Sequence, residues 1–261
     1  MLTYSGIIPV PDVEPMSSST QQQPTSQRLT CRVAGLTQFN HEIMQVLLQP
    51  DPPRMLRFRP GQYINIVLNG QEMRPFSLAS APREDNLIEL HVRHNAGGRF
   101  ARWLQHDLDE DARVTIEGPH GEFSIHDSTR PIIMIAGGTG FAPIKSLIEF
   151  IIDEQIDRTV YLYWGARTRE DLYLQNLAQR WGRLHDNIHY VPVLSEEAPA
   201  AGVRTGLVHA AVLEDFPGLE NYEVYVCGPV GLIRAVQESF LQYGLDEKAL
   251  FSDMFAFLDN N

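Results

Sequence analysis

The pattern of hydrophobic and polar positions changes once along this chain, near residue 128. Between Leu29 and Ser128, short stretches are β-branched or alternate between apolar and polar residues, and Gly, Pro and Asn separate them. These stretches read LTCRVAGL, EIMQVLLQP, QYINIVL, LIELHVRH and ARVTIEG. The pattern predicts short strands joined by turns, and hence a small antiparallel barrel. One helical pattern, over residues 99–108, interrupts it.

After Arg130 the apolar stretches lose their alternation. PIIMIAGG, TVYLYWG, IHYVPVL and YEVYVCG are almost continuously apolar, as is typical of parallel strands buried on both faces. Helical patterns lie between them, the clearest at residues 141–154. Alternating strands and helices predict a doubly wound parallel sheet. We therefore expect a β-barrel domain over residues 29–128 and an α/β domain over residues 129–261.

Residues 1–28 differ from both domains. They are rich in Ser, Gln, Thr and Pro, with the run SSSTQQQPTSQ at 17–27. Such a segment buries too little apolar surface to offset the entropy lost on ordering, so we expect a flexible tail. The alternative is that the few apolar residues of SGIIPVPDVEP dock on a domain.

Composition excludes several classes of function. The net charge of -12 argues against nucleic-acid binding, which needs a basic surface. Cys31 and Cys227, the two cysteines, cannot form a disulfide framework or a four-thiolate cluster. His91 and His94 are three apart on a predicted strand and would face opposite sides, so we expect no metal site. Without a long apolar run or a signal-peptide pattern, we expect a cytoplasmic protein with no membrane span.

The stretch IAGGTGFAP, at 135–143, combines a buried strand, a glycine-rich turn and a helix start. Helix N-termini attract phosphate, and glycines let the backbone approach a pyrophosphate. The spacing is not that of the common dinucleotide fingerprint, because Pro143 stands where a third glycine would be. The next strand also ends in Gly165, Ala166 and Arg167 without an acidic ribose ligand. We favour a phosphate site over a plain tight turn because strand, turn and helix follow in the right order.

Cys227 ends the buried strand of VYVCGPVGL. In an open parallel sheet this position lies at the carboxyl edge, where ligands bind. The alternative is an inert cysteine, since free cysteines are among the most buried residues.

The barrel half contains MRPFSLASAP at 73–82, in which Pro75 is expected to interrupt strand pairing. Arg74 suits a phosphate, Phe76 a flat ring, and Ser77 a ring nitrogen. A planar, phosphorylated ligand would use all three, although each also has an ordinary structural explanation. Gly97 and Gly98 precede the predicted helix and form a second candidate anion site.

Taken together, RPFS, GGTGFAP and CGP resemble the flavin, pyridine-nucleotide and hydride-transfer motifs of the ferredoxin–NADP reductase superfamily. The resemblance extends from about Leu29 to Phe257. MRPFSLASAP, YWGART and LFSDMFAF look most like the bacterial NAD(P)H–flavin reductases. The resemblance implies a six-stranded flavin-binding barrel, a nicotinamide-binding α/β domain, FAD or FMN as flavin, and NADH or NADPH as donor.

The resemblance also assigns roles. Arg74 would hold a flavin phosphate, Phe76 would contact the isoalloxazine, and Ser77 would bond the nitrogen that accepts hydride. Cys227 would lie beside the nicotinamide, and Asp253 stands where relatives carry a Glu near the flavin. Ser77, Cys227 and Asp253 form the expected catalytic set. The other expected cofactor-binding residues are Pro75, His91, Val92, Gly97, Gly98, Arg99, Gly137, Gly138, Thr139, Gly140, Arg167, Gly228, Pro229 and Phe255.

Three functions remain open. The first is an NAD(P)H–flavin reductase, which Ala101 favours, because the family often has a phosphate-binding Ser there and its absence predicts loosely held flavin. The second is an FAD-containing reductase component that passes electrons to a separate iron–sulfur or haem protein. The third, a non-catalytic regulatory subunit, is disfavoured because both nucleotide motifs are intact.

The sequence also bears on the choice between NADH and NADPH. Arg167 and Arg169 offer cations for a 2′-phosphate. Against this, Glu196 and Glu197 follow Ser195 in the loop where relatives often hold that phosphate, and like charge repels a dianion. We expect a preference for NADH.

Overall fold

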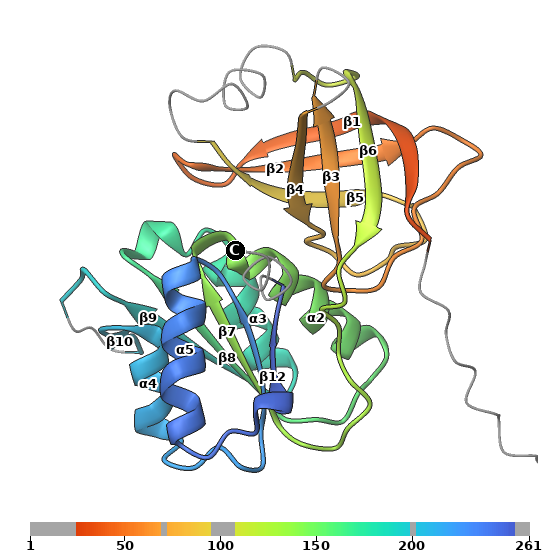
Figure 1. The fold of residues 1–261 in the computed structure, drawn as a ribbon. Coiled ribbons are helices and arrows are strands. Elements are labelled where there is room, and N and C mark those ends of the chain that lie inside the picture. The colour runs from red at the N-terminus through yellow and green to blue at the C-terminus, as the bar shows by residue number, and fades with distance from the viewer. Residues whose placement is uncertain (1–24, 69–71, 95–107, 199–201, 254–261) are drawn as a thin grey trace, which may run out of the picture.

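The computed structural model describes residues 25–68, 72–94, 108–198 and 202–253 (Figure 1). Most of the expected tail therefore lies outside the described residues. So does the helix expected within residues 99–108, apart from its last residue, together with Gly97, Gly98, Arg99, Ala101 and Phe255.

The first domain is a six-stranded antiparallel sheet in the order β4-β3-β6-β1-β2-β5. An isolated bridge between Leu78 and Leu90 brings its two edges together and closes the sheet towards a barrel. This confirms the expected fold. The strands are β1 (Gln27–Gln38), β2 (Ile43–Pro50), β3 (Tyr63–Leu68), β4 (Glu72–Ser77), β5 (Ile88–Arg93) and β6 (Arg113–His120).

Two details of the barrel correct the sequence-based expectations. Strand pairing begins at Gln27, inside the expected tail, because Arg28 pairs with Glu117 of β6 through both backbone register and a 2.9 Å ion pair. Pairing also continues through Pro75, which lies opposite Asn65. A proline is accepted here because β4 is an edge strand, whose outer N–H groups need no partner.

The second domain is a six-stranded parallel sheet in the order β10-β9-β8-β7-β11-β12. Its strands are β7 (Ile132–Gly137), β8 (Val160–Ala166), β9 (Ile188–Leu194), β10 (Arg204–Thr205), β11 (Glu223–Cys227) and β12 (Leu250–Ser252). The helices are η1 (Gly138–Gly140), α2 (Phe141–Asp153), η2 (Arg169–Asp171), α3 (Gln175–Leu184), α4 (Val208–Asp215), α5 (Val230–Gln242) and η3 (Glu247–Ala249).

Helices cover both faces of this sheet, which confirms the doubly wound fold (Figure 1). Residues of α2 and α3 share one core with Ile132, Met134 and Ala136, whereas α4 and α5 share the other with Ile133 and Ile135. Every residue of β7 and β11 is buried. This explains the unbroken apolar runs of the sequence, since both faces of each strand meet a helix layer.

The order of the strands locates the site. From β7 the chain moves outward to β8 and β9, and then returns to β11 on the other side of β7. The carboxyl ends of β7 and β11 therefore flank the point where the order reverses, which is where open α/β sheets bind ligands. The glycine turn follows one of these strands, and Cys227 ends the other.

Candidate active site

Ser77, Asp253 and Cys227 meet at the junction of the two domains. Ser77 ends β4 of the barrel, and its hydroxyl donates a hydrogen bond to Oδ2 of Asp253 across 3.4 Å. Asp253 directly follows β12, which pairs with β11 so that Val226 lies opposite Ser252. This register places the carboxyl of Asp253 beside the thiol of Cys227. The structure thus brings together all three residues expected to be catalytic.

Burial controls the ionisation of this cluster. It raises the pKa of the Cys227 thiol well above its usual value, and the negative charge of Asp253 raises it further. The thiol is therefore protonated and does not act as a nucleophile. Burial also raises the pKa of Asp253, although hydrogen bonds from Cys227 and Ser77 oppose that rise.

One oxygen of the cluster has no hydrogen-bond partner among the described residues. Oδ1 of Asp253 is covered from solvent and accepts no hydrogen bond from the residues that the structure describes. Buried polar atoms are nearly always satisfied in native proteins. A bound ring with an N–H group would satisfy this one, so the described part of the site fits a flavin.

The glycine turn packs directly against the end of β11. A Cβ atom on Gly140 would lie 2.2 Å from the carbonyl oxygen of Cys227, which no side chain tolerates. Gly138 has a φ of +54°, and a Cβ there would lie 2.8 Å from Nη2 of Arg93. The glycines thus permit two close approaches: one between the turns of neighbouring strands, and one between the turn and the barrel.

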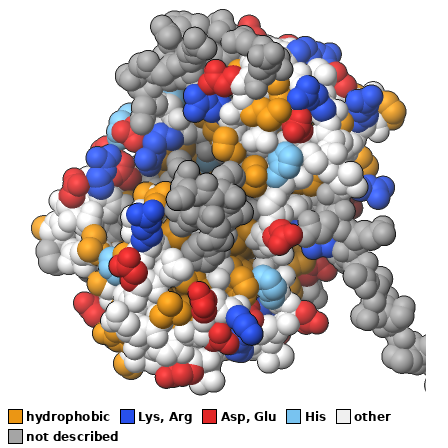
Figure 2. Space-filling view, viewed as in Figure 1, with side chains coloured by type: hydrophobic (Ala, Val, Ile, Leu, Met, Phe, Trp, Pro, Cys, Tyr) orange, Lys and Arg blue, Asp and Glu red, His pale blue; other side chains and the backbone are white. Residues whose placement is uncertain are grey.

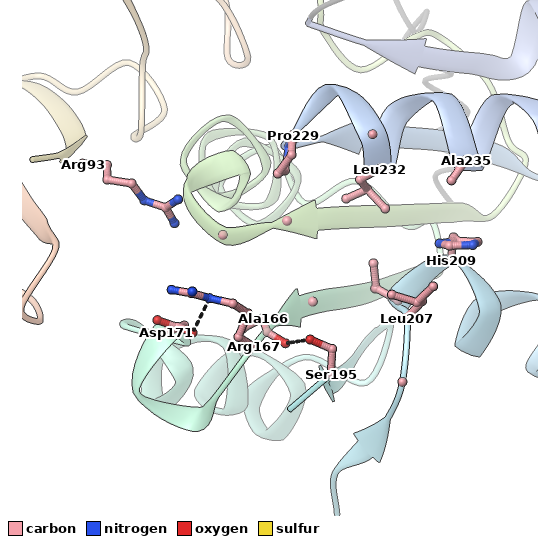
Figure 3. A pocket seen from close by; sticks show the side chains of 16 residues that line it. Arg93, Ala166, Arg167, Asp171, Ser195, Leu207, His209, Pro229, Leu232 and Ala235 are labelled. Atoms are coloured by element: carbon pink, nitrogen blue, oxygen red, sulfur yellow. Dashed lines mark hydrogen bonds and ion pairs between the residues drawn. The ribbon is translucent and has the colours of Figure 1, made fainter. Parts of the chain in front are cut away.

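A cavity of about 540 Å³ opens at the carboxyl edge of the parallel sheet (Figure 3). The glycine turn, the end of β8, the loop before α4 and the first turns of α5 enclose it. Of the expected cofactor-binding residues, Gly137, Gly138, Arg167 and Pro229 line it. Thr139 and Gly140 belong to the glycine turn, Cys227 ends β11, and Gly228 follows it. Further lining residues are Arg93, Asp171, Ser195, Leu207, His209 and Leu232.

Arg93 is the site residue that sequence reasoning missed. It ends β5 in the barrel, and its side chain extends across the domain boundary towards the glycine turn (Figure 3). Glu42 balances its charge at 3.6 Å. A guanidinium above a glycine turn suits a pyrophosphate. The available signal was its position at the end of the HVR strand, but only the fold shows that this strand end meets Gly138.

The expected flavin-binding residues of the barrel have different surroundings. Arg74 is exposed and pairs with Glu72 at 2.8 Å, and Pro75 beside it is exposed as well. Phe76 is partly buried against the barrel core. The side chains of His91 and Val92 are buried. Any flavin contact of these last two would therefore involve their backbone.

His91 bonds inside the protein through both ring nitrogens. Nδ1 lies 2.9 Å from the hydroxyl of Tyr173, and Nε2 lies 3.0 Å from Oε1 of Glu89. Phe39 packs edge-on against the imidazole ring. The histidine that the resemblance assigned to the cofactor thus joins the barrel to the loop before α3.

Asp171 is an acidic residue that lines the cavity. Asp171 pairs with Arg167 at 3.8 Å. The carboxylate of Glu197 accepts a hydrogen bond from the backbone N–H of Arg169. Ser195 donates to the carbonyl of Ala166 across 3.5 Å. Arg167 therefore already has an anionic partner here.

No three His, Cys, Asp or Glu side chains of the described ranges gather into a metal-binding group. None of the helices in the described part of the chain is long and apolar enough to cross a membrane.

Comparison with known proteins agrees with this geometry. An oxidoreductase FAD-binding domain model matches residues 30–125, and an oxidoreductase NAD-binding domain model matches residues 134–238. The chain is 39% identical to the CDP-6-deoxy-L-threo-D-glycero-4-hexulose-3-dehydrase reductase of Yersinia pestis over 86% of this chain and 68% of that protein. It is 36% identical to the NAD(P)H-flavin reductase of Vibrio harveyi, over 88% of this chain and 99% of that one.

A solved structure is similar as well. The Amycolatopsis cytochrome P450 reductase superposes with a TM-score of 0.82 at 30% identity, covering 91% of this chain and 72% of the other. The two domain families match in this order, and the relatives match over most of their length. These findings classify the chain. The chain belongs to the ferredoxin–NADP reductase superfamily.

Proposed function

We propose that this protein takes hydride from NAD(P)H and transfers it to a flavin held by the barrel, acting as an NAD(P)H–flavin reductase. The observation that carries the proposal is the meeting of Ser77 and Asp253 with Cys227, beside the edge where the cavity opens. One residue of the set comes from the flavin motif, and the other two come from the nicotinamide-binding domain. The likeness to the Vibrio harveyi NAD(P)H-flavin reductase supports the same reaction.

The chain's own residues orient the reactants. Bound flavin supplies the hydride acceptor, and the protein supplies position and electrostatics. Asp253 accepts a hydrogen bond from Ser77 and thereby fixes the direction of that hydroxyl. The protonated thiol of Cys227 adds no negative charge beside the nicotinamide. Holding two rings in contact at a fixed angle lowers the barrier by removing the entropy of their encounter.

Arg93 and the glycine turn would bind the dinucleotide. The guanidinium lies against Gly138, and the turn leads directly into the N-terminus of α2, where the N–H of Phe141 is bonded to the turn itself. Cation and helix N-terminus both favour a pyrophosphate. On the apolar side, Pro229 and Leu232 of the α5 end complete the cavity.

NADH is the donor that we favour. Asp171 lines the cavity and neutralises Arg167, and the carboxylate of Glu197 accepts a hydrogen bond from the backbone of Arg169. A 2′-phosphate bound beside Arg167 would therefore meet negative charge. Like charge discriminates against the phosphate.

A second function is supported by two relatives. The Yersinia pestis and Amycolatopsis proteins are both named as reductases of other enzymes. The alternative is therefore a reductase component that passes electrons singly to a separate iron–sulfur or haem protein. On the face shown in Figure 2, the described acidic and basic side chains are interspersed rather than gathered by sign. A docking surface of one sign is not evident there among the described residues.

One assay separates the two functions. Purified protein is given NADH and added FMN, FAD or riboflavin, with no other protein present. Turnover that depends on added flavin supports the flavin reductase. If flavin remains bound through desalting and added flavin is not turned over, the protein is instead a reductase component.

A further inference from the structure

Helix α2 holds the segment that follows the flavin motif. Three of its side chains hydrogen-bond consecutive backbone groups of residues 79–81, the ASA of MRPFSLASAP. Lys145 Nζ donates to the carbonyl of Ala79 at 2.9 Å, Ser146 Oγ donates to that of Ser80 at 2.7 Å, and Glu149 Oε2 accepts from the N–H of Ala81 at 3.2 Å. We call this set of three bonds the α2 clasp.

Lys145 also binds the barrel through its charge. Its ammonium group lies 3.0 Å from Oε2 of Glu89 on β5 and 2.7 Å from Oε1 of Glu149. The side chains of Lys145 and Glu89 are 6% and 7% exposed, so water screens the pair little. Burial alone would raise the pKa of Glu89, but the hydrogen bond from His91 and the charge of Lys145 hold it at about 2.

The ionised Glu89 sets the direction of the bonds beyond it. Because its Oε1 can only accept, His91 Nε2 must donate to it across 3.0 Å. Burial lowers the pKa of His91, so the ring is neutral and its Nδ1 accepts from the Tyr173 hydroxyl at 2.9 Å. The chain of bonds thus runs from the loop before α3, through β5, to α2.

The elements joined in this way carry the parts of the active site. Residues 79–81 lie two to four positions after Ser77. Strand β5 ends in Arg93, and α2 begins immediately after the glycine turn. A buried ion pair of this kind adds little net stability, because removing two charges from water offsets most of their attraction. Its distinctive effect is to fix position.

We propose that Lys145 is a positioning residue for hydride transfer, because it ties the helix of the glycine turn to the backbone behind Ser77 and to the strand that carries Arg93. The proposal rests on the proposed function. The α2 clasp sets how close the nicotinamide and flavin rings lie, and at what angle. A misplacement of about 1 Å can slow a reaction of this type by roughly a hundredfold.

The test removes the two buried charges of the Lys145–Glu89 pair together, while Glu149, 28% exposed, loses its cation but keeps the hydrogen bond from the N–H of Ala81. The double variant Lys145→Met with Glu89→Gln deletes both charges and keeps the side-chain volumes. The matched control is Arg158→Met with Glu223→Gln. It removes another buried ion pair, 2.7 Å apart, whose two residues both lie in the α/β domain. Glu223 is at the opposite end of β11 from Cys227.

The readout is stopped-flow flavin reduction at saturating NADH, with melting temperature measured in parallel. We expect the Lys145 variant to reduce flavin at least about tenfold more slowly than wild type, whereas the control keeps the wild-type rate with a comparable change in melting temperature. A wild-type rate in the Lys145 variant, or equal slowing in the control, would overturn the proposal.

Two further outcomes are distinguished. If the double variant does not fold, Glu89→Gln alone removes the charge that β5 offers to Lys145, which keeps Glu149 as its partner: slower reduction than the control supports the proposal, and an unchanged rate overturns it. If wild-type protein reduces no flavin with NADH, the proposed function fails and this inference fails with it. Wild-type activity with an unaffected variant removes this inference alone.

Discussion

The hydroxyl of Ser77 donates to the carboxylate of Asp253 across 3.4 Å, although the two residues are 176 positions apart. Ser77 ends the barrel strand that carries the flavin motif, and Asp253 follows the last described strand of the parallel sheet. One hydrogen bond therefore connects the two halves of the active site. Its acceptor belongs to a carboxyl whose second oxygen is buried and has no partner among the described residues.

Replacing Ser77 with Ala should slow flavin reduction by NADH more than it weakens flavin binding. The hydroxyl contributes most as hydride arrives, so its loss should lower the rate constant by about tenfold or more. Stopped-flow reduction measures the rate, and fluorescence titration measures flavin affinity. Ser239→Ala, which removes a hydroxyl bonded to a helix carbonyl on α5, is the control. An unchanged rate in Ser77→Ala would exclude Ser77 from the reaction.

Replacing Arg93 with Ala should raise KM for NADH and leave flavin affinity unchanged. A lost charge-assisted hydrogen bond to a pyrophosphate corresponds to a rise of roughly tenfold to a hundredfold. The KM of Arg93→Lys for NADH should lie between those of wild type and Arg93→Ala, because lysine keeps the charge but lacks the planar guanidinium. Arg32→Ala serves as control, since that arginine pairs with Asp111 on the barrel surface. An equal KM in Arg93→Ala and wild type would contradict the assignment.

NADH should be used with a higher kcat/KM than NADPH. Replacing Glu197 with Gln should narrow the difference by improving NADPH alone, because the variant removes a negative charge that a 2′-phosphate would meet. Steady-state kinetics with both donors measures this. The prediction is wrong if wild-type protein uses NADPH equally well or better.

Stability should depend on Glu89 in a defined range of pH. Its pKa is about 2 in the folded protein, below the ordinary value of 4.5, so ionised Glu89 stabilises the fold above the ordinary pKa. That contribution is lost as the pH falls from the ordinary value towards the folded one. The free energy of unfolding, measured with urea, should therefore differ between wild type and Glu89→Gln by a large amount near pH 7 and by less near about pH 3. A constant difference would refute this.

Neither cysteine should react in the native protein. Burial raises the pKa of Cys31 to about 12 and that of Cys227 well above its usual value. A thiol-specific chromogenic reagent at about pH 8 should label neither residue in native protein and both in denaturant. Cys31→Ala isolates Cys227 for the same measurement. Rapid labelling of Cys227 in the native state would show that its thiol is accessible and ionised.

The sequence by itself determined the two architectures and their order. Alternation in YINIVL, where Ile64 and Ile66 are buried, is a local consequence of the two-residue period of a strand. The fully apolar PIIMIAGG follows from helices on both faces of β7. The glycine turn and the cysteine at the end of β11 could also be predicted, because each is defined by the residues next to it in the sequence.

Tertiary structure alone decided which of these residues meet. Strand order makes β4 an edge strand, so Pro75 is accommodated without breaking the strand. The parallel pairing of β11 with β12 places Asp253 beside Cys227.

The contact between the domains brings Arg93 to Gly138 and Lys145 to Glu89, and it directs His91 into the interior. A periodic pattern records whether a side chain is buried, because burial depends on which face of its own element it occupies. It does not record which partner is buried with it, because that depends on elements far away along the chain.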